Sequence, residues 1–211
     1  MKNPWIDIPL EIYESHMSLS DVAQLQALND IMREQVMAYP VAESVAVLGV
    51  AGGNGLEHCL ERFKLVYGID INLAYLAMCT KRFRWAIGKS LRLIEADLSK
   101  PESVIPQADL ILANLLIEYV GIGIFCKKAA MAQAQYVSCV IQGIDCEQSF
   151  VSESPYQSAF HGIGKLHQDV DEMKLSFEMA LYHYTQVYRE SYDMPNSKSL
   201  VRLDYSLDDR R

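Results

Sequence analysis

The feature of this sequence that most constrains its fold is a glycine-rich turn behind a short apolar run. Residues 45–48 are Val-Ala-Val-Leu, and residues 49–55 contain four glycines. The pattern predicts a buried strand, a tight turn and a helix from about residue 55, with the helix N-terminus over the carboxyl edge of a parallel sheet. Glycine suits such a turn because it tolerates positive φ and lets a ligand approach the backbone. A plain β–α turn rarely needs so many glycines, so we interpret the segment as a site for a nucleotide-like ligand.

An acidic residue closes the next predicted strand. Residues 64–70 form a short apolar run that ends at Asp70, 21 residues after Gly49. An acid at this distance meets a ribose diol in nucleotide-binding α/β proteins, because a carboxylate accepts hydrogen bonds from two hydroxyls. The dinucleotide pattern G-x-G-x-x-G is poorly met, since Ala51 and Asn54 occupy its third and sixth positions when it starts at Gly49. The residues therefore indicate an adenosine-containing ligand, and they weaken the case for a dinucleotide.

Strands and helices are expected to alternate through most of the chain. We predict strands at residues 45–50, 64–70, 91–96, 108–113 and 136–143, and helices at 55–62, 73–84, near 101–105, and at 118–132. Such alternation is typical of a parallel sheet with helices on both faces. A helix at 169–179 follows a long loop, and two alternating strands at 181–189 and 199–205 then predict a C-terminal hairpin.

This order of glycine turn, strands and acids resembles the class I S-adenosylmethionine-dependent methyltransferases over about residues 40–207. The resemblance implies an α/β fold with a doubly wound, seven-stranded, mostly parallel sheet and a C-terminal antiparallel hairpin. It implies S-adenosyl-L-methionine as cofactor, with the methionine part in the glycine turn, ribose on the acid after strand two and adenine beside the acid after strand three. The end of strand four would face the methyl group. The cofactor-binding residues implied in this way are Gly49, Val50, Ala51, Gly53, Asp70, Ile71, Asp97, Leu98 and Asn114.

Two residues depart from the family pattern. Val47 stands where the family usually has an acid, and Ala51 stands where it has its middle glycine. Methyl transfer to a small-molecule acceptor is the function that we expect. Two alternatives stay open: the same fold with another transfer, such as aminopropyl transfer from a decarboxylated relative of the cofactor, and a cofactor-binding protein without activity.

Candidate residues for the methyl acceptor follow the fourth predicted strand and lie in the N-terminal segment. Transfer from a sulfonium needs positioning and exclusion of water, and a hydroxyl or ammonium acceptor also needs a general base. Glu118 and Tyr119 are the candidates for catalysis, although Glu118 could instead only favour a helix N-terminus. The candidates for substrate contact are Tyr13, His16 and His161.

Residues 1–40 are expected to form a lid segment and a helix, before a methyltransferase domain at 41–211 within a single overall domain. Pro4 and Pro9 are predicted to prevent regular structure near the N-terminus, and Ser18 or Ser20 to cap a helix that ends near residue 37. The first residues are rich in apolar side chains, which a mobile tail would leave in water. They are predicted to cover the acceptor pocket, the alternative being inert packing on the far side of the sheet.

Composition argues against several partners. The net charge is −8, with 19 basic and 27 acidic residues, which disfavours nucleic acid. The Asn-Pro-Pro-Tyr pattern of base methylation is also missing, because Leu115 follows Asn114. No long apolar stretch predicts a membrane span, no secretory pattern is visible, and five cysteines without a C-x-x-C pair indicate reduced thiols and no metal site. We therefore expect a cytoplasmic enzyme with a small-molecule partner and leave its oligomeric state open.

Overall fold

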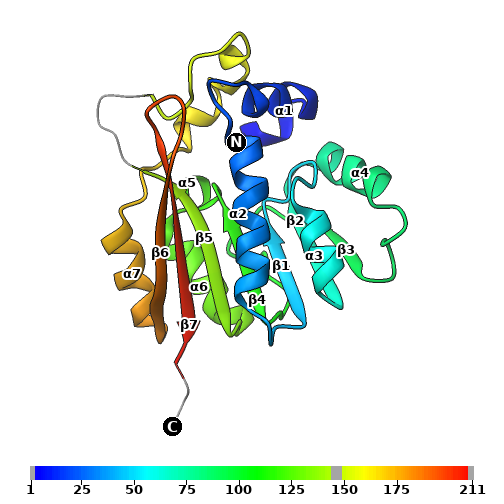
Figure 1. Cartoon of the computed structure of the whole chain (residues 1–211), viewed down its shortest axis with the longest axis vertical. Helices are drawn as coiled ribbons and strands as arrows, with labels where there is room; N and C mark the ends of the chain where they lie inside the picture. The colour runs from blue at the N-terminus through cyan, green and yellow to red at the C-terminus, as the bar shows by residue number, and fades with distance from the viewer. Residues whose placement is uncertain (1–2, 144–148, 209–211) are drawn as a thin grey trace.

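The computed structural model describes residues 3–143 and 149–208, and the strands in these residues form one sheet in the order β3-β2-β1-β4-β5-β7-β6 (Figure 1). Strands β1 to β5 pair in parallel, whereas β7 runs antiparallel to both β5 and β6. This arrangement confirms the predicted fold class, including the C-terminal hairpin. The strands are β1 Ser44–Leu48, β2 Leu65–Asp70, β3 Leu91–Glu95, β4 Leu110–Asn114, β5 Tyr136–Gln142, β6 Tyr184–Asp193 and β7 Ser199–Leu207.

Strand β1 shows why these residues build the centre of the sheet. Val45 and Val47 point to one face, Ala46 and Leu48 point to the other, and all four are buried. A parallel strand that is covered on both faces needs such continuous apolar sequence. Val47, which departs from the family pattern, therefore fills the core.

Helices cover both faces of the sheet (Figure 1). On one face lie α2 Gln24–Ala38, α3 Leu56–Arg62 and α4 Leu73–Arg82. On the other face lie α5 Ile117–Val120, α6 Ile122–Ala132 and α7 Glu172–Leu181. The glycine turn leads from β1 into α3, so the carboxyl edge of the sheet lies beside the N-termini of α3 and α4.

The N-terminal segment is more regular than predicted. A 3-10 helix, η1, spans Pro4–Asp7, and helix α1 spans Leu10–Ser18. Pro4 is the first residue of η1 and Pro9 caps α1, positions where proline loses no helical hydrogen bond. The expectation that these prolines prevent regular structure is therefore wrong. Ser18 ends α1, and Ala23 rather than Ser18 or Ser20 is the cap of α2.

Two other local predictions also differ from the structure. Residues 101–105 contain a turn and no helix. The helix predicted at 118–132 is divided into α5 and α6 at Gly121, whose φ of 88° interrupts helical geometry. After β5, the long segment contains two short 3-10 helices, η2 Gln157–Phe160 and η3 Ile163–Lys165, and it lies against the N-terminal segment (Figure 1).

Four cysteines, at positions 59, 79, 126 and 139, are buried and free, while Cys146 lies outside the described residues. Within the described ranges, no helix combines the length and the apolar character that crossing a bilayer requires.

Candidate active site

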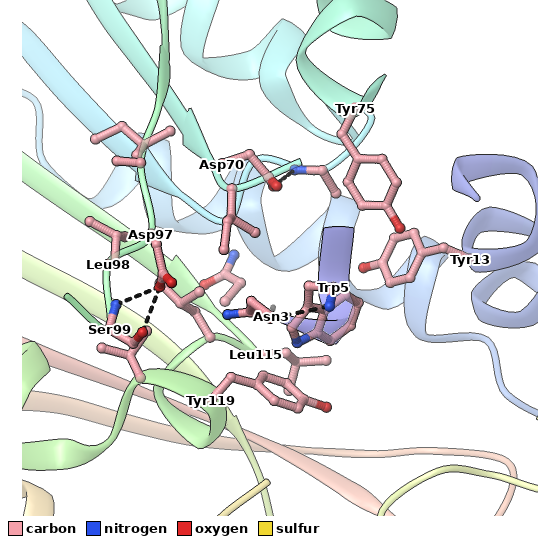
Figure 2. Close-up of a pocket in the computed structure, with 18 residues that line it drawn as sticks. Asn3, Trp5, Tyr13, Asp70, Tyr75, Asp97, Leu98, Ser99, Leu115 and Tyr119 are labelled. Atoms are coloured by element: carbon pink, nitrogen blue, oxygen red, sulfur yellow. Dashed lines mark hydrogen bonds between the residues drawn. The ribbon is translucent and has the colours of Figure 1, made fainter. Parts of the chain in front are cut away.

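A cavity of about 700 Å³ opens at the carboxyl ends of β1 to β4. The structure brings most of the predicted cofactor residues together here, from four separate segments of chain (Figure 2). Those that line it are Gly49, Ala51, Asp70, Ile71, Asp97, Leu98 and Asn114. Val50 and Gly53 do not line it.

The backbone of the glycine turn explains why Gly49 and Ala51 line the cavity and Val50 and Gly53 do not. Gly49 has a φ of +69°, and a Cβ there would lie 3.2 Å from Leu116 beside the cavity. Ala51 adopts a φ of 47°, which is uncommon for a residue with a side chain. Gly53 has a φ of +89°, and its Cβ would lie 2.5 Å from the Phe83 ring. Gly53 is therefore needed for close packing against the end of α4, and a side chain there would not enter the cavity. Val50 is a core residue beneath the turn.

Asp70 joins the glycine turn to the start of α4. Its Oδ2 accepts a hydrogen bond from the backbone N–H of Ala51 at 2.8 Å, and its Oδ1 accepts one from Asn72 N–H at 2.8 Å. Burial raises the pKa of Asp70, and the backbone donors oppose that shift. Each carboxylate oxygen can accept more than one hydrogen bond, so both can still receive a ligand hydroxyl.

Asp97 occupies the loop after β3. Its Oδ1 accepts hydrogen bonds from the backbone N–H of Ser99 at 3.0 Å and from the Ser99 hydroxyl at 2.6 Å. These bonds hold the carboxylate beside the cavity (Figure 2). Sequence reasoning did not find Ser99.

Asn114 is held by a buried polar network. Its amide exchanges two hydrogen bonds with Gln35 of α2, at 2.9 and 3.0 Å. Gln35 also donates to the Ser138 hydroxyl at 2.9 Å, and Ser138 donates to Asp204 of β7. Arg202 forms a buried ion pair with Asp204 at 2.6 Å. Helix α2 and the terminal hairpin thus orient a residue that lines the cavity. A glutamine within the apolar stripe of α2 was the available signal for this network.

A second cavity, of about 520 Å³, adjoins the first. The two share Trp5, Tyr13, Leu115 and Tyr119, so these four residues form the boundary between them. Leu115 has a φ of 52°, a strained conformation of the kind that collects at functional sites. The second cavity therefore lies where a molecule could meet a ligand in the first.

Glu118 of α5 lines this second cavity and is 3% exposed. Its Oε1 accepts a hydrogen bond from Gln142 N–H at 2.8 Å, and its Oε2 is buried with no partner among the described residues. Burial raises the pKa of Glu118 to about 7. Tyr119 beside it also has a raised pKa, chiefly through burial, so it is a neutral phenol at neutral pH. Of the two catalytic candidates, only Glu118 can take up a proton.

Glu118→Gln is expected to stabilise the protein at alkaline pH. The folded-state pKa lies above the unfolded one, so ionisation destabilises the fold as pH rises from about 4.5 to about 7. We expect the variant to exceed the wild type by about 3 kcal/mol in unfolding free energy at pH 8, and to equal it at pH 4. Urea titrations at several pH values measure this, with the exposed Glu61→Gln as the matched control. A difference independent of pH would contradict the assignment.

The three residues predicted to contact the substrate lie in different places. Tyr13 and His16 line the second cavity, and the His16 Nδ1 lies 2.7 Å from the Ser154 hydroxyl. His161 is exposed and lines neither cavity, because η2 turns Phe160 inward in its place. His167 lines the second cavity instead. The structure therefore places Tyr13, His16 and His167 at the second cavity and His161 outside both cavities.

The N-terminal segment lies directly on the cavities. Asn72 donates a side-chain hydrogen bond to the Trp5 carbonyl at 2.9 Å. Glu14 of α1 forms a two-point ion pair with Arg82, which also donates to the Gly52 carbonyl at 2.8 Å. The segment is thus attached to the glycine turn and to α4, and it is not inert packing on the far side of the sheet. In Figure 2, Trp5 and Tyr13 lie across the cavity from Asp97.

One further cavity residue was missed by sequence reasoning. Tyr75 of α4 lines the first cavity, and its buried hydroxyl has no partner among the described residues. A buried hydroxyl without a hydrogen bond is costly, so it suits a ligand with a polar group at this point. In the same described part of the chain, no cluster of three or more His, Cys, Asp or Glu side chains could hold a metal ion.

No protein-family model matches the sequence, and the search of curated proteins found no match. Solved structures do match. The N-methyltransferase NodS from Bradyrhizobium japonicum WM9, crystallised with S-adenosyl-L-homocysteine, has a TM-score of 0.69 and 11% identity over 99% of this chain and 100% of that chain. The geranyl diphosphate C-methyltransferase from Streptomyces coelicolor A3(2) has a TM-score of 0.67 and 11% identity over 89% of this chain and 83% of that chain.

A third neighbour is named as a cyclase and not as a methyltransferase. The [4+2]-cyclase SpnF has a TM-score of 0.65 and 7% identity over 86% of this chain and 82% of that chain. At such identities the likeness establishes the fold alone, which is that of the class I S-adenosylmethionine-dependent methyltransferases. The reaction and its acceptor depend on the residues of the two cavities.

Proposed function

We propose that this chain transfers the methyl group of S-adenosyl-L-methionine to a small-molecule acceptor held in the second cavity. The observation that carries the proposal is the pair of adjoining cavities, one lined by Asp70 and Asp97 and the other by Glu118. Neighbours with this fold were crystallised with S-adenosyl-L-homocysteine, which supports the choice of cofactor.

The residues of the first cavity fit this cofactor. Asp70 would accept hydrogen bonds from the ribose hydroxyls, and Asp97 with Leu98 would contact the adenine. The turn at Gly49 and Ala51 would hold the methionine part, and the unpartnered Tyr75 hydroxyl would bind one of its polar groups. When bound, the cofactor supplies an electrophilic methyl group on a sulfonium.

The residues of the boundary would position the acceptor and exclude water. Trp5 and Tyr119 pack edge to face, with ring centroids 4.9 Å apart, across the place where the cavities meet. Closing the N-terminal segment over the acceptor would keep the reacting atoms dry, which favours a displacement that depends on orientation. Glu118 would accept the proton that the acceptor loses.

S-adenosylmethionine and S-adenosylhomocysteine are each expected to raise the melting temperature, whereas NAD is not. A ligand at 100 times its Kd stabilises the folded state by about 2.7 kcal/mol, which corresponds to roughly 5–10 °C in a chain of this size. Differential scanning fluorimetry with the three compounds at equal concentration makes the comparison. The proposal is contradicted if neither sulfur compound raises the melting temperature, or if NAD raises it more.

A further inference from the structure

The second cavity combines one buried carboxylate with a wall of aromatic rings. The unpartnered Oε2 of Glu118 is the feature that calls for a ligand, because a buried oxygen without a donor is costly. The other oxygen of Glu118 is already bonded to Gln142 N–H. The main chain therefore fixes the carboxyl group beside the cavity and leaves one buried oxygen without a donor among the described residues.

Aromatic side chains follow one another around the cavity. Trp5 packs edge to face with Tyr13, with centroids 6.1 Å apart, and with Tyr119 at 4.9 Å. Tyr119 in turn contacts His167 at 5.7 Å, and His167 stacks on Phe150 at 4.0 Å. Aromatic faces attract cations, and sets of such rings are the usual way in which proteins recognise substituted ammonium groups.

The charges around Glu118 also favour a ligand with an ammonium group. Among the described residues that line the cavity, Glu118 is the one acid, and no lysine or arginine is present. His16 and His167 have lowered pKa values, mainly through burial and further through Lys198, so both are neutral at neutral pH. The Lys198 ammonium donates to the Phe150 carbonyl at 2.9 Å and does not line the cavity. No described cation in the cavity therefore satisfies Glu118.

Building on the proposed function, we infer that the methyl acceptor is a small amine with an apolar or aromatic body, whose nitrogen binds Glu118 Oε2. An ammonium group gains from both the carboxylate and the ring faces. An alcohol or phenol gains less from either, and a carboxylate ligand would be repelled by Glu118. The body of the amine packs against the rings that surround the cavity.

The reaction balances with the groups that are present. The bound ammonium gives a proton to Glu118 Oε2, which frees the lone pair of the nitrogen. The nitrogen attacks the methyl carbon, and a C–N bond forms as the C–S bond breaks with its electron pair passing to sulfur. The products are a methylated ammonium ion and a neutral thioether, and the proton on Glu118 returns to solvent.

Trp5 provides a direct readout of binding. The chain has two tryptophans, and Trp85 is 56% exposed, so Trp85→Phe leaves Trp5 as the only tryptophan without disturbing the core. In this background and with saturating S-adenosylhomocysteine, we would titrate 2-phenylethylamine, 2-phenylethanol and 3-phenylpropanoate. We expect the amine to bind at least tenfold more tightly than the alcohol and the carboxylate to bind most weakly. Glu118→Gln should weaken amine binding at least tenfold and leave alcohol binding unchanged, while Glu61→Gln should change neither.

Each outcome decides one question. Equal binding of the amine and the alcohol, or unchanged amine binding by Glu118→Gln, overturns the amine inference. Calorimetry with S-adenosylhomocysteine alone is run in parallel and tests the proposed function by itself. If that cofactor product fails to bind, the proposed function fails, and the amine series repeated without it still shows whether Glu118 holds an ammonium group.

Discussion

Arg202→Met is expected to lower the free energy of unfolding by about 3–5 kcal/mol. Arg202 is 3% exposed and Asp204 is 1% exposed, and the guanidinium donates to both carboxylate oxygens, at 3.0 and 2.6 Å. Methionine keeps most of the side-chain volume and removes the charge. The Asp204 carboxylate would then be buried without its counter-ion, which costs far more than the loss of a surface pair.

Urea unfolding at neutral pH measures this effect. Two control variants show whether it comes from the buried charge on Asp204. Lys64 and Glu43 form an ion pair whose side chains are 75% and 64% exposed, so Lys64→Met should change stability by less than about 1 kcal/mol. The double variant Arg202→Met with Asp204→Asn removes both charges and should recover much of the loss. A single Arg202 variant as stable as the wild type would contradict the expectation that Asp204 needs this counter-ion in the folded state.

Asp70→Ala is expected to weaken binding of S-adenosylhomocysteine by roughly 10²–10⁴-fold. The reason is the loss of two charge-assisted hydrogen bonds to the ribose, each contributing about 1.5–3 kcal/mol. Isothermal titration calorimetry measures the affinity directly. Because Asp70 also accepts the backbone N–H of Ala51, Asp70→Asn is included to retain an acceptor for the turn.

The sheet offers a matched control for this variant. Glu95 ends β3 in register with Asp70 at the end of β2, yet it is exposed and does not line the cavity. Glu95→Ala should therefore bind S-adenosylhomocysteine as the wild type does. Equal affinity in the Asp70 and Glu95 variants would mean that the ribose does not bind at the end of β2.

Much of the fold could be predicted from the sequence because local patterns encode it. The strands are short apolar runs, and each parallel strand must end at the same edge, so Asp70, Asp97 and Asn114 come together once the order of elements is known. Gly53 shows the limit of this reasoning. Its positive φ follows from the turn, but what a Cβ would meet there depends on Phe83 at the end of α4.

The acceptor side could be predicted less well because its parts come from irregular chain. Trp5 lies in a 3-10 helix, and Phe150 and His167 lie in the long segment after β5, where no periodicity assigns an inward face. His161 and His167 are equivalent as sequence, and only tertiary packing separates the exposed ring from the one in the cavity. Gln35 stands out as a polar residue in the apolar stripe of α2, but its role depends on contacts with β4 and β5 that the sequence does not show.

A crystal structure of the chain with S-adenosylhomocysteine tests the central claim most directly. The result that we predict is a ligand in the first cavity with its ribose hydroxyls on Asp70, its adenine beside Asp97, and its sulfur facing the boundary formed by Leu115 and Tyr119. Electron density for the ligand outside this cavity, or a ribose that makes no contact with Asp70, would contradict the account.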